Sequence, residues 1–164
     1  MGSMYFQAIL AVVAALVAVG ASVCFWMLRK PVQKKIVIIG GRGTGKTKLF
    51  LALSKKEAEG ANTLPTVEEN VEKLPNGTLL IDTPGHKKIH MTKTLSSLAP
   101  TDTVLYLFNK REGASLGHIL PGRIVKIYTG PGEVDRQYSK YSLSVKDAEK
   151  FQKEVRTMAK ELRL

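Results

Sequence analysis

The sequence predicts an α/β fold in which a mostly parallel sheet is flanked by helices, with one transmembrane helix before it. Three observations support this prediction. The apolar run at residues 36–39 leads directly into a glycine-rich loop and a helix-forming segment. Strand-like and helix-like segments alternate through the rest of the chain, as in parallel sheets. Residues 5–28 contain no charged side chain.

The N-terminal segment Tyr5–Leu28 has the length and composition of a membrane span. Only Gln7 and Ser22 among its 24 residues are clearly polar, and about 20 apolar residues cross a bilayer. Aromatic residues stand at both ends, as at two membrane interfaces: Tyr5, Phe6, Phe25 and Trp26. A cleaved signal peptide would have a shorter core, a basic start and a small-residue cleavage site. None of these is present, so we expect a signal-anchor helix.

Charge predicts the orientation of this span. A basic juxtamembrane linker, residues 29–35, follows it, whereas residues 1–4 carry no side-chain charge. Because positive charge stays on the cytosolic side, the C-terminal part is expected in the cytosol. The whole formal charge of +11 lies in residues 29–164, which indicates anionic lipid, RNA or an acidic partner. Without a nucleic-acid motif, we expect no direct sequence-specific nucleic-acid binding.

The glycine-rich loop fits the phosphate-binding pattern G-x-x-x-x-G-K-[ST]. Its residues are Gly40, Gly41, Arg42, Gly43, Thr44, Gly45, Lys46 and Thr47, followed by Lys48. Glycines allow successive backbone N–H groups to point into one concavity that holds the α- and β-phosphates of a nucleotide. Lys46 can reach the β- and γ-phosphates, and the Thr47 hydroxyl can ligate Mg²⁺. The helix that opens at Lys48 also favours a bound anion.

Residues after this loop predict further strands and helices in order. Leu49, Phe50 and Leu53 give one apolar side to a helix ending near residue 60. Residues 67–74 and 78–82 flank Pro75-Asn76-Gly77, where Asn-Gly predicts positive φ angles in a tight hairpin. A basic helix is expected before Pro100, and strands at 104–108 and 124–128.

The last helix has the clearest pattern. Apolar residues recur at three- and four-residue spacing, which predicts one buried stripe: Ala148, Phe151, Val155, Met158 and Leu162. Ser144 and Asp147 precede the stripe, and we expect the Ser144 hydroxyl to cap the first turn. This helix is predicted to close the α/β layer.

A second set of candidate site residues follows the hairpin. Asp82 ends a predicted strand, where its carboxylate could hold Mg²⁺ through water. Gly85 permits the backbone to approach a γ-phosphate, and His86 could orient an attacking water as a catalytic group. Together with the phosphate-binding loop, this pattern predicts a nucleotide-binding switch.

Two segments carry a family resemblance. Leu64–Glu72 is similar to the Arf-type switch I, in which a Pro-Thr pair leads into an Asn-Val-Glu strand. Asp82–His86 resembles the start of switch II in receptor β subunits, which share the Pro-Gly-His ending. The chain therefore resembles the Ras-like GTPases and, more narrowly, the group of Arf proteins and signal-recognition-particle receptor β subunits.

This resemblance implies a reduced Ras-like P-loop NTPase domain over residues 36–164 that binds GTP or GDP with Mg²⁺. Thr66 would be the switch threonine, with its hydroxyl on Mg²⁺ and its N–H near the γ-phosphate. The implied partner is the receptor α subunit, through its N-terminal domain, with the ribosome and signal recognition particle reached indirectly. The implied location is the endoplasmic reticulum membrane, and hydrolysis would be slow.

The chain departs from the family pattern in several places. Glu68 and Glu69 replace a glycine and an aromatic residue of Arf proteins. The guanine-reading motif Asn/Thr-Lys-x-Asp has no clean match in the chain, and two places are considered for it. Asn109 and Lys110 begin a similar tetrapeptide that ends in Glu112, whereas the family order places the motif after residues 124–128, at Thr129–Gly132. Residues 109–142 are too few for all the usual helices, so one or two are expected as loops.

Two other functions remain open at this stage. One is an Arf-like membrane GTPase in vesicle traffic. The other is a membrane scaffold that is stabilised by nucleotide and has little turnover.

Overall fold

The computed structural model describes residues 2–28, 33–55, 68–85, 93–116, 120–132 and 134–164. The chain divides into two compact units, Met1–Val32 and Gln33–Leu164. The first contains one helix, α1 (Gly2–Leu28). Among the described residues, no helix combines the length and the apolarity that crossing a membrane requires. The transmembrane helix at residues 5–28 stays a prediction.

The second unit is built on a six-stranded sheet of order β2-β3-β1-β4-β5-β6. Its strands are β1 (Lys35–Gly40), β2 (Asn70–Lys73), β3 (Leu79–Asp82), β4 (Thr103–Phe108), β5 (Arg123–Tyr128) and β6 (Tyr141–Ser142). Only β2 runs antiparallel to its neighbour, and the other four pairings are parallel. The predicted mostly parallel α/β sheet is confirmed.

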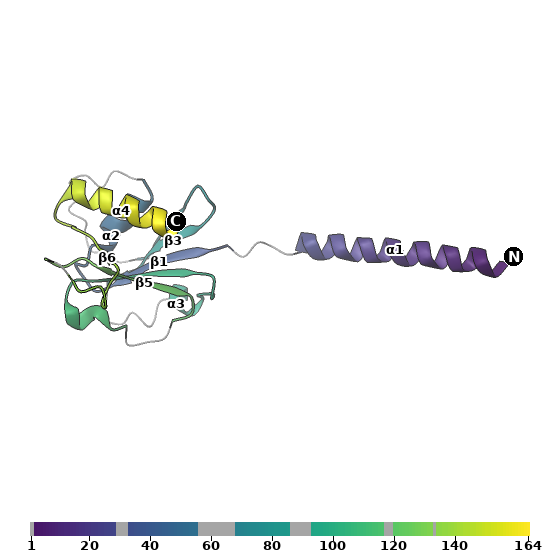
Figure 1. Ribbon diagram of the computed structural model, residues 1–164, viewed down its shortest axis with the longest axis horizontal. Coiled ribbons are helices and arrows are strands. Elements are labelled where there is room, and N and C mark those ends of the chain that lie inside the picture. The colour runs from purple at the N-terminus through teal and green to yellow at the C-terminus, as the bar shows by residue number, and fades with distance from the viewer. Residues whose placement is uncertain (1, 29–32, 56–67, 86–92, 117–119, 133) are drawn as a thin grey trace. The chain divides into compact units, whose positions relative to one another are not determined.

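Helices cover both faces of this sheet (Figure 1). They are α2 (Lys46–Leu53), α3 (Lys93–Ser96), the 3-10 helix η2 (Arg111–Ala114) and α4 (Ala148–Leu162). β1 shows why two layers are needed, because its side chains alternate between two cores. Ile36 and Ile38 join α2 and α4 in one apolar cluster. Val37 and Ile39 join residues of α3 and η2 in the other.

The β2–β3 turn differs in detail from the expected one. Gly77 has a positive φ of 81°, but Asn76 does not. The Asn76 side chain instead accepts a hydrogen bond from the Thr78 N–H at 3.0 Å, and the Gly77 N–H donates to the Leu74 carbonyl at 2.9 Å. Because the Asn76 side chain provides an acceptor for the Thr78 N–H, the turn forms with a positive φ at Gly77 alone.

The stripe of α4 is confirmed for its four large side chains, Phe151, Val155, Met158 and Leu162, which are all buried. Ala148 is exposed, which corrects the predicted stripe at its first position. The expected cap is also wrong. Asp147, not Ser144, accepts from the Lys150 N–H at 3.0 Å. The Ser144 hydroxyl and N–H both donate to the Glu154 carboxylate, so this serine is already engaged.

The region between β4 and β6 is short of helices, as expected. Among the described residues 109–116, 120–132 and 134–142 there is only η2 and no α-helix.

A buried carboxylate, that of Asp102, fixes the start of this half of the sheet. Asp102 accepts from the Lys35 N–H at 2.9 Å and the Ala99 N–H at 2.8 Å. It therefore joins the beginning of β1 to the turn before β4.

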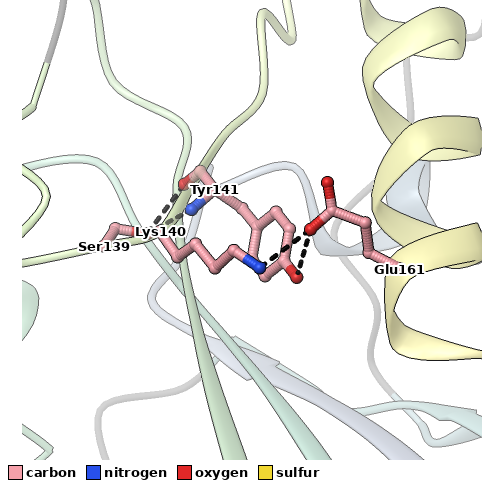
Figure 2. A network of polar contacts seen from close by, with 4 residues as sticks. All are labelled: Ser139, Lys140, Tyr141 and Glu161. Atoms are coloured by element: carbon pink, nitrogen blue, oxygen red, sulfur yellow. Dashed lines mark hydrogen bonds and ion pairs between the residues drawn. The ribbon is translucent and has the colours of Figure 1, made fainter.

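A polar network joins the sheet edge at β6 to α4 (Figure 2). The Glu161 carboxylate accepts from the Lys140 ammonium at 2.9 Å and the Tyr141 hydroxyl at 3.1 Å. The Ser139 hydroxyl donates to the Tyr141 carbonyl at 2.7 Å. The hydrogen bond to Glu161 raises the pKa of Lys140, and the same contact lowers the pKa of Glu161. Because both side chains are exposed, the network mainly fixes geometry at a strand of only two residues.

Candidate functional site

The phosphate-binding loop begins at the carboxyl end of β1 and depends on glycine at several positions. Gly40, Gly43 and Gly45 have φ angles of 153°, 75° and 83°, which side-chain-bearing residues rarely adopt. A Cβ on Gly40 would collide with the Leu107 carbonyl oxygen of β4. The glycines therefore let the loop turn tightly against the end of the sheet. Thr44 is buried and its hydroxyl donates to the Gly41 carbonyl at 2.9 Å, which fixes the curl.

Lys46 lies inside this loop rather than in solvent. Its side chain is only 6% exposed, and its ammonium donates to the Gly41 carbonyl at 2.9 Å. Burial lowers the pKa of Lys46, and the charge of Asp82 opposes that shift. An ammonium that is held in a concavity with few partners gains strongly from an arriving anion.

A second contact joins the loop to β3. The Thr47 hydroxyl donates to the Asp82 carboxylate at 2.9 Å. Asp82 is fully buried at the last position of β3, and the parallel register places it beside Ile38 of β1. The following residue, Thr83, donates to the Ile38 carbonyl at 2.8 Å. The sheet itself thus brings the two predicted metal ligands, 35 residues apart in the sequence, into contact.

Gly85 brings the segment after β3 against the loop. A Cβ built on Gly85 would lie 2.7 Å from the Lys46 ammonium nitrogen and 3.1 Å from the Arg42 Cα. The absence of a side chain is therefore what permits this close approach. The predicted sites in β3 and in the phosphate-binding loop form one continuous site. Arg42 itself is exposed.

The sequence of this domain matches a known protein family. The family described as 50S ribosome-binding GTPase matches residues 35–129, which is more than half of the chain. The chain belongs to this GTPase family. The match begins with β1, ends directly after β5, and contains both the phosphate-binding loop and Asp82–Gly85. No curated protein matches the chain at a significant level.

Oxygen donors in the GTPase domain fit a magnesium ion better than a softer metal. The described residues contain no group of three or more His, Cys, Asp or Glu side chains that could hold a metal by themselves. Thr47 and Asp82 offer one hydroxyl and one carboxylate. Mg²⁺ is usually held by one or two such groups together with substrate phosphates and waters. The donor set therefore fits a metal that arrives with a nucleotide.

Two predicted residues, Thr66 and His86, lie outside the described residues, and their roles stay predictions. The contact of Lys48 with a bound anion also stays a prediction. In the structure the Lys48 ammonium donates to the Val145 carbonyl at 3.4 Å. Glu69, a departure from the Arf pattern, accepts a hydrogen bond from the Thr94 hydroxyl of α3.

The two alternative positions for the guanine-reading motif lie next to each other. Asn109 is half-buried directly after β4, and Lys110 is exposed. The Thr129 N–H and hydroxyl both donate to the Phe108 carbonyl, at 2.9 and 3.2 Å. A Cβ on Gly130 would collide with the Asn109 carbonyl oxygen. The loops after β4 and β5 therefore form one surface, and the structure does not separate the two alternatives.

Sequence reasoning missed the loop after β6, between Leu143 and Asp147. Val145 packs on the phosphate-binding loop so closely that a Cβ on Gly45 would lie 3.1 Å from its methyl carbons. Its position follows a rule that could have identified it, since ligands of open α/β sheets bind beyond the carboxyl ends of parallel strands. The short length of β6 conceals this strand end in the sequence.

Proposed function

We propose that this protein is a membrane-anchored GTP-binding switch of the signal-recognition-particle receptor β type. In this proposal, its GTP-bound switches hold the receptor α subunit for co-translational targeting to the endoplasmic reticulum. The observation that carries the switch is the pair of contacts from the phosphate-binding loop to the end of β3. Gly85 lies against the Lys46 ammonium, and Thr47 bonds to Asp82.

These contacts couple nucleotide binding to the segment after β3. To bind a triphosphate, Lys46 exchanges the Gly41 carbonyl for phosphate oxygens. Thr47 and Asp82 would then hold Mg²⁺ with their oxygens, and the ion would supply charge neutralisation on the β- and γ-phosphates when bound. Both changes alter the surface on which Gly85 rests. Binding of a γ-phosphate would thereby rearrange the segment after β3. We propose that this segment is part of the partner-binding surface.

Guanine specificity is supported by membership of the GTPase family and by the placement of the loops. The loops after β4, β5 and β6 lie at the same sheet edge as the phosphate-binding loop, because these strands are parallel to β1 or joined to it through parallel neighbours. We propose that the base lies on these loops, with Asn109 and Lys110 among the contacts. Hydrolysis of GTP to GDP would be slow, with His86 orienting the water.

Membrane attachment is supported by the N-terminal segment. The sequence from Tyr5 to Leu28 is uncharged, and α1 spans 27 residues, about 40 Å of helix. Ile9, Leu10 and Leu16 of this helix are each more than 60% exposed. We propose a single-pass anchor in the endoplasmic reticulum membrane with the GTPase domain in the cytosol.

Partner capture tests the proposal. The full chain is loaded with a non-hydrolysable GTP analogue or with GDP and is mixed with the N-terminal domain of the receptor α subunit. We expect at least tenfold more capture with the analogue, and none for Lys46→Ala. Equal capture in all three samples would disprove the switch.

The capture experiment and the nucleotide that copurifies with the protein separate the two alternatives. An Arf-like GTPase of vesicle traffic would not bind the receptor α subunit with either GDP or the GTP analogue. A scaffold with little turnover would be purified with intact GTP, and His86→Ala would leave that occupancy unchanged.

A further inference from the structure

A groove of about 900 Å³ lies at the end of the sheet away from the phosphate-binding loop. Its floor is apolar and comes from three elements and one turn: Ile36 of β1, Leu53 of α2, Leu74 before the hairpin turn, and Val155 and Ala159 of α4. Leu53 and the final residue, Leu164, are only partly buried against the core. The groove therefore leaves apolar surface in contact with solvent, on a part of the domain that the nucleotide site does not use.

The charged side chains among the described residues of the lining are all cationic. Lys55, Arg156 and Lys160 line the groove with exposed side chains, and none of the described residues that line it has an acidic side chain. Two acids of α4 stand next to lining residues: Glu161 is already bonded to Lys140 and Tyr141, and Glu154 to Ser144. An apolar floor with three cations above it is complementary to a molecule with an apolar body and an anionic head.

The size of the groove favours a small amphiphile over a protein segment. Ligand sites range from about 300 to 1,000 Å³, and this groove falls within that range. An α-helix about 10 Å wide would fill the same volume with roughly two turns. Two turns bury far less surface than the roughly 800 Å² per partner of a stable protein interface.

We propose that this groove binds one anionic phospholipid, with an acyl chain on the apolar floor and the head group at Lys55, Arg156 and Lys160. In the sequence, only residues 29–32 separate Gln33, the first residue of this unit, from the proposed membrane anchor. The inference rests on the proposed membrane attachment for the source of the lipid, and it does not depend on nucleotide binding.

Lipid titration of the full chain in an uncharged detergent tests this inference. Native mass spectrometry measures the Kd for phosphatidylserine and for phosphatidylcholine with identical acyl chains. We expect phosphatidylserine to bind about tenfold or more tightly in the wild type, because each cation near an anionic head group adds attraction. The variant K55E/R156E/K160E should reduce this preference to less than twofold.

A matched control reverses three other exposed cations, in the variant R111E/K126E/R136E. It should keep the wild-type preference, although its net charge changes equally. Ala159→Trp should weaken both lipids about tenfold by filling the floor. An unchanged preference in K55E/R156E/K160E would overturn the proposal.

Crosslinking gives a result that does not depend on any variant. Phosphatidylserine with a photoreactive acyl chain should label peptides that contain residues 52–55 or 155–164. Label confined to residues 5–30 would overturn the groove while leaving the anchor intact. Conversely, if alkaline carbonate extracts the chain from membranes while these groove contacts persist, the membrane proposal fails and the groove remains.

Discussion

Replacing Lys46 by methionine separates nucleotide binding from stability. Lys46 is 6% exposed and is held by one hydrogen bond to the Gly41 carbonyl. Burial lowers its pKa more strongly than the charge of Asp82 raises it, so the ammonium is on balance unfavourable in the nucleotide-free fold. Methionine has a similar length and carries no charge. We therefore expect the free energy of unfolding of the nucleotide-free variant to be about 1 kcal/mol higher than that of the wild type, or equal to it.

The same change should severely weaken nucleotide binding. A hydrogen bond to a charged group contributes about 1.5–3 kcal/mol, which corresponds to a Kd that rises roughly 10- to 150-fold when the bond is lost. Urea unfolding without nucleotide measures the stability, and titration with a fluorescent GTP analogue measures the Kd. Lys126→Met, at an exposed position of β5, is the control and should change neither.

The pH dependence of stability has a defined sign. Because the folded-state pKa of Lys46 lies below the unfolded value, its penalty is complete at pH values below the folded pKa. The penalty disappears as pH rises through the folded pKa toward the unfolded value of about 10.4. The stability advantage of Lys46→Met should thus shrink over this alkaline window. A variant that binds GTP within twofold of the wild type, or loses more than about 2 kcal/mol of stability, would refute the reasoning.

Three further substitutions test single contacts, and Gly43→Ala is a matched control for one of them. Thr47→Ala removes the hydroxyl that bonds to Asp82, and should raise the Mg²⁺ concentration for half-maximal nucleotide retention about tenfold; unchanged retention in an EDTA titration would argue against a metal site. Gly40→Ala should cost about 2–4 kcal/mol in urea unfolding, because its Cβ meets Leu107, whereas Gly43→Ala, with open space around it, should cost about 1 kcal/mol. Asp102→Ala leaves the Lys35 and Ala99 N–H groups without their acceptor and should cost about 2–5 kcal/mol; a loss below 1 kcal/mol would contradict the joining role.

Local sequence patterns predicted most of the sheet. The continuous apolar run in β1 marks a strand that is buried on both faces, and the alternation of its side chains between two cores bears this out. β6 could not be predicted in the same way, because two residues carry no periodicity. Its position depends on bonds from elsewhere in the fold, such as that from the Leu143 N–H to the Tyr128 carbonyl at 2.8 Å.

Competition between similar residues explains the wrong helix cap. Ser144 and Asp147 both have side chains that cap helices well. Asp147 caps the helix because Ser144 is bound elsewhere. The N–H and the hydroxyl of Ser144 both donate to the carboxylate of Glu154, ten residues further along the chain. A contact of this kind depends on tertiary packing and leaves no mark in the local sequence.

The candidate site likewise contains contacts that local sequence predicts and contacts that depend on the tertiary fold. The phosphate-binding pattern and the aspartate at a strand end predicted residues that the structure brings into contact, since Thr47 bonds to Asp82. The contact of Val145 with Gly45 was not predicted, because it requires the end of β6 to lie beside the phosphate-binding loop. Phosphate recognition is local in sequence, whereas the surface for the base is assembled from distant loops.

Nucleotide selectivity tests the central claim most directly. The full chain, freed of nucleotide, is titrated with fluorescent GTP in the presence of Mg²⁺, and unlabelled GTP and ATP compete for the site. Our account predicts one site per chain, competition by GTP at least 100-fold stronger than by ATP, and a Kd that rises roughly 10- to 150-fold in Lys46→Met. Equal competition by the two nucleotides, or a Kd in this variant within twofold of the wild-type value, would contradict a guanine-nucleotide switch built on the phosphate-binding loop.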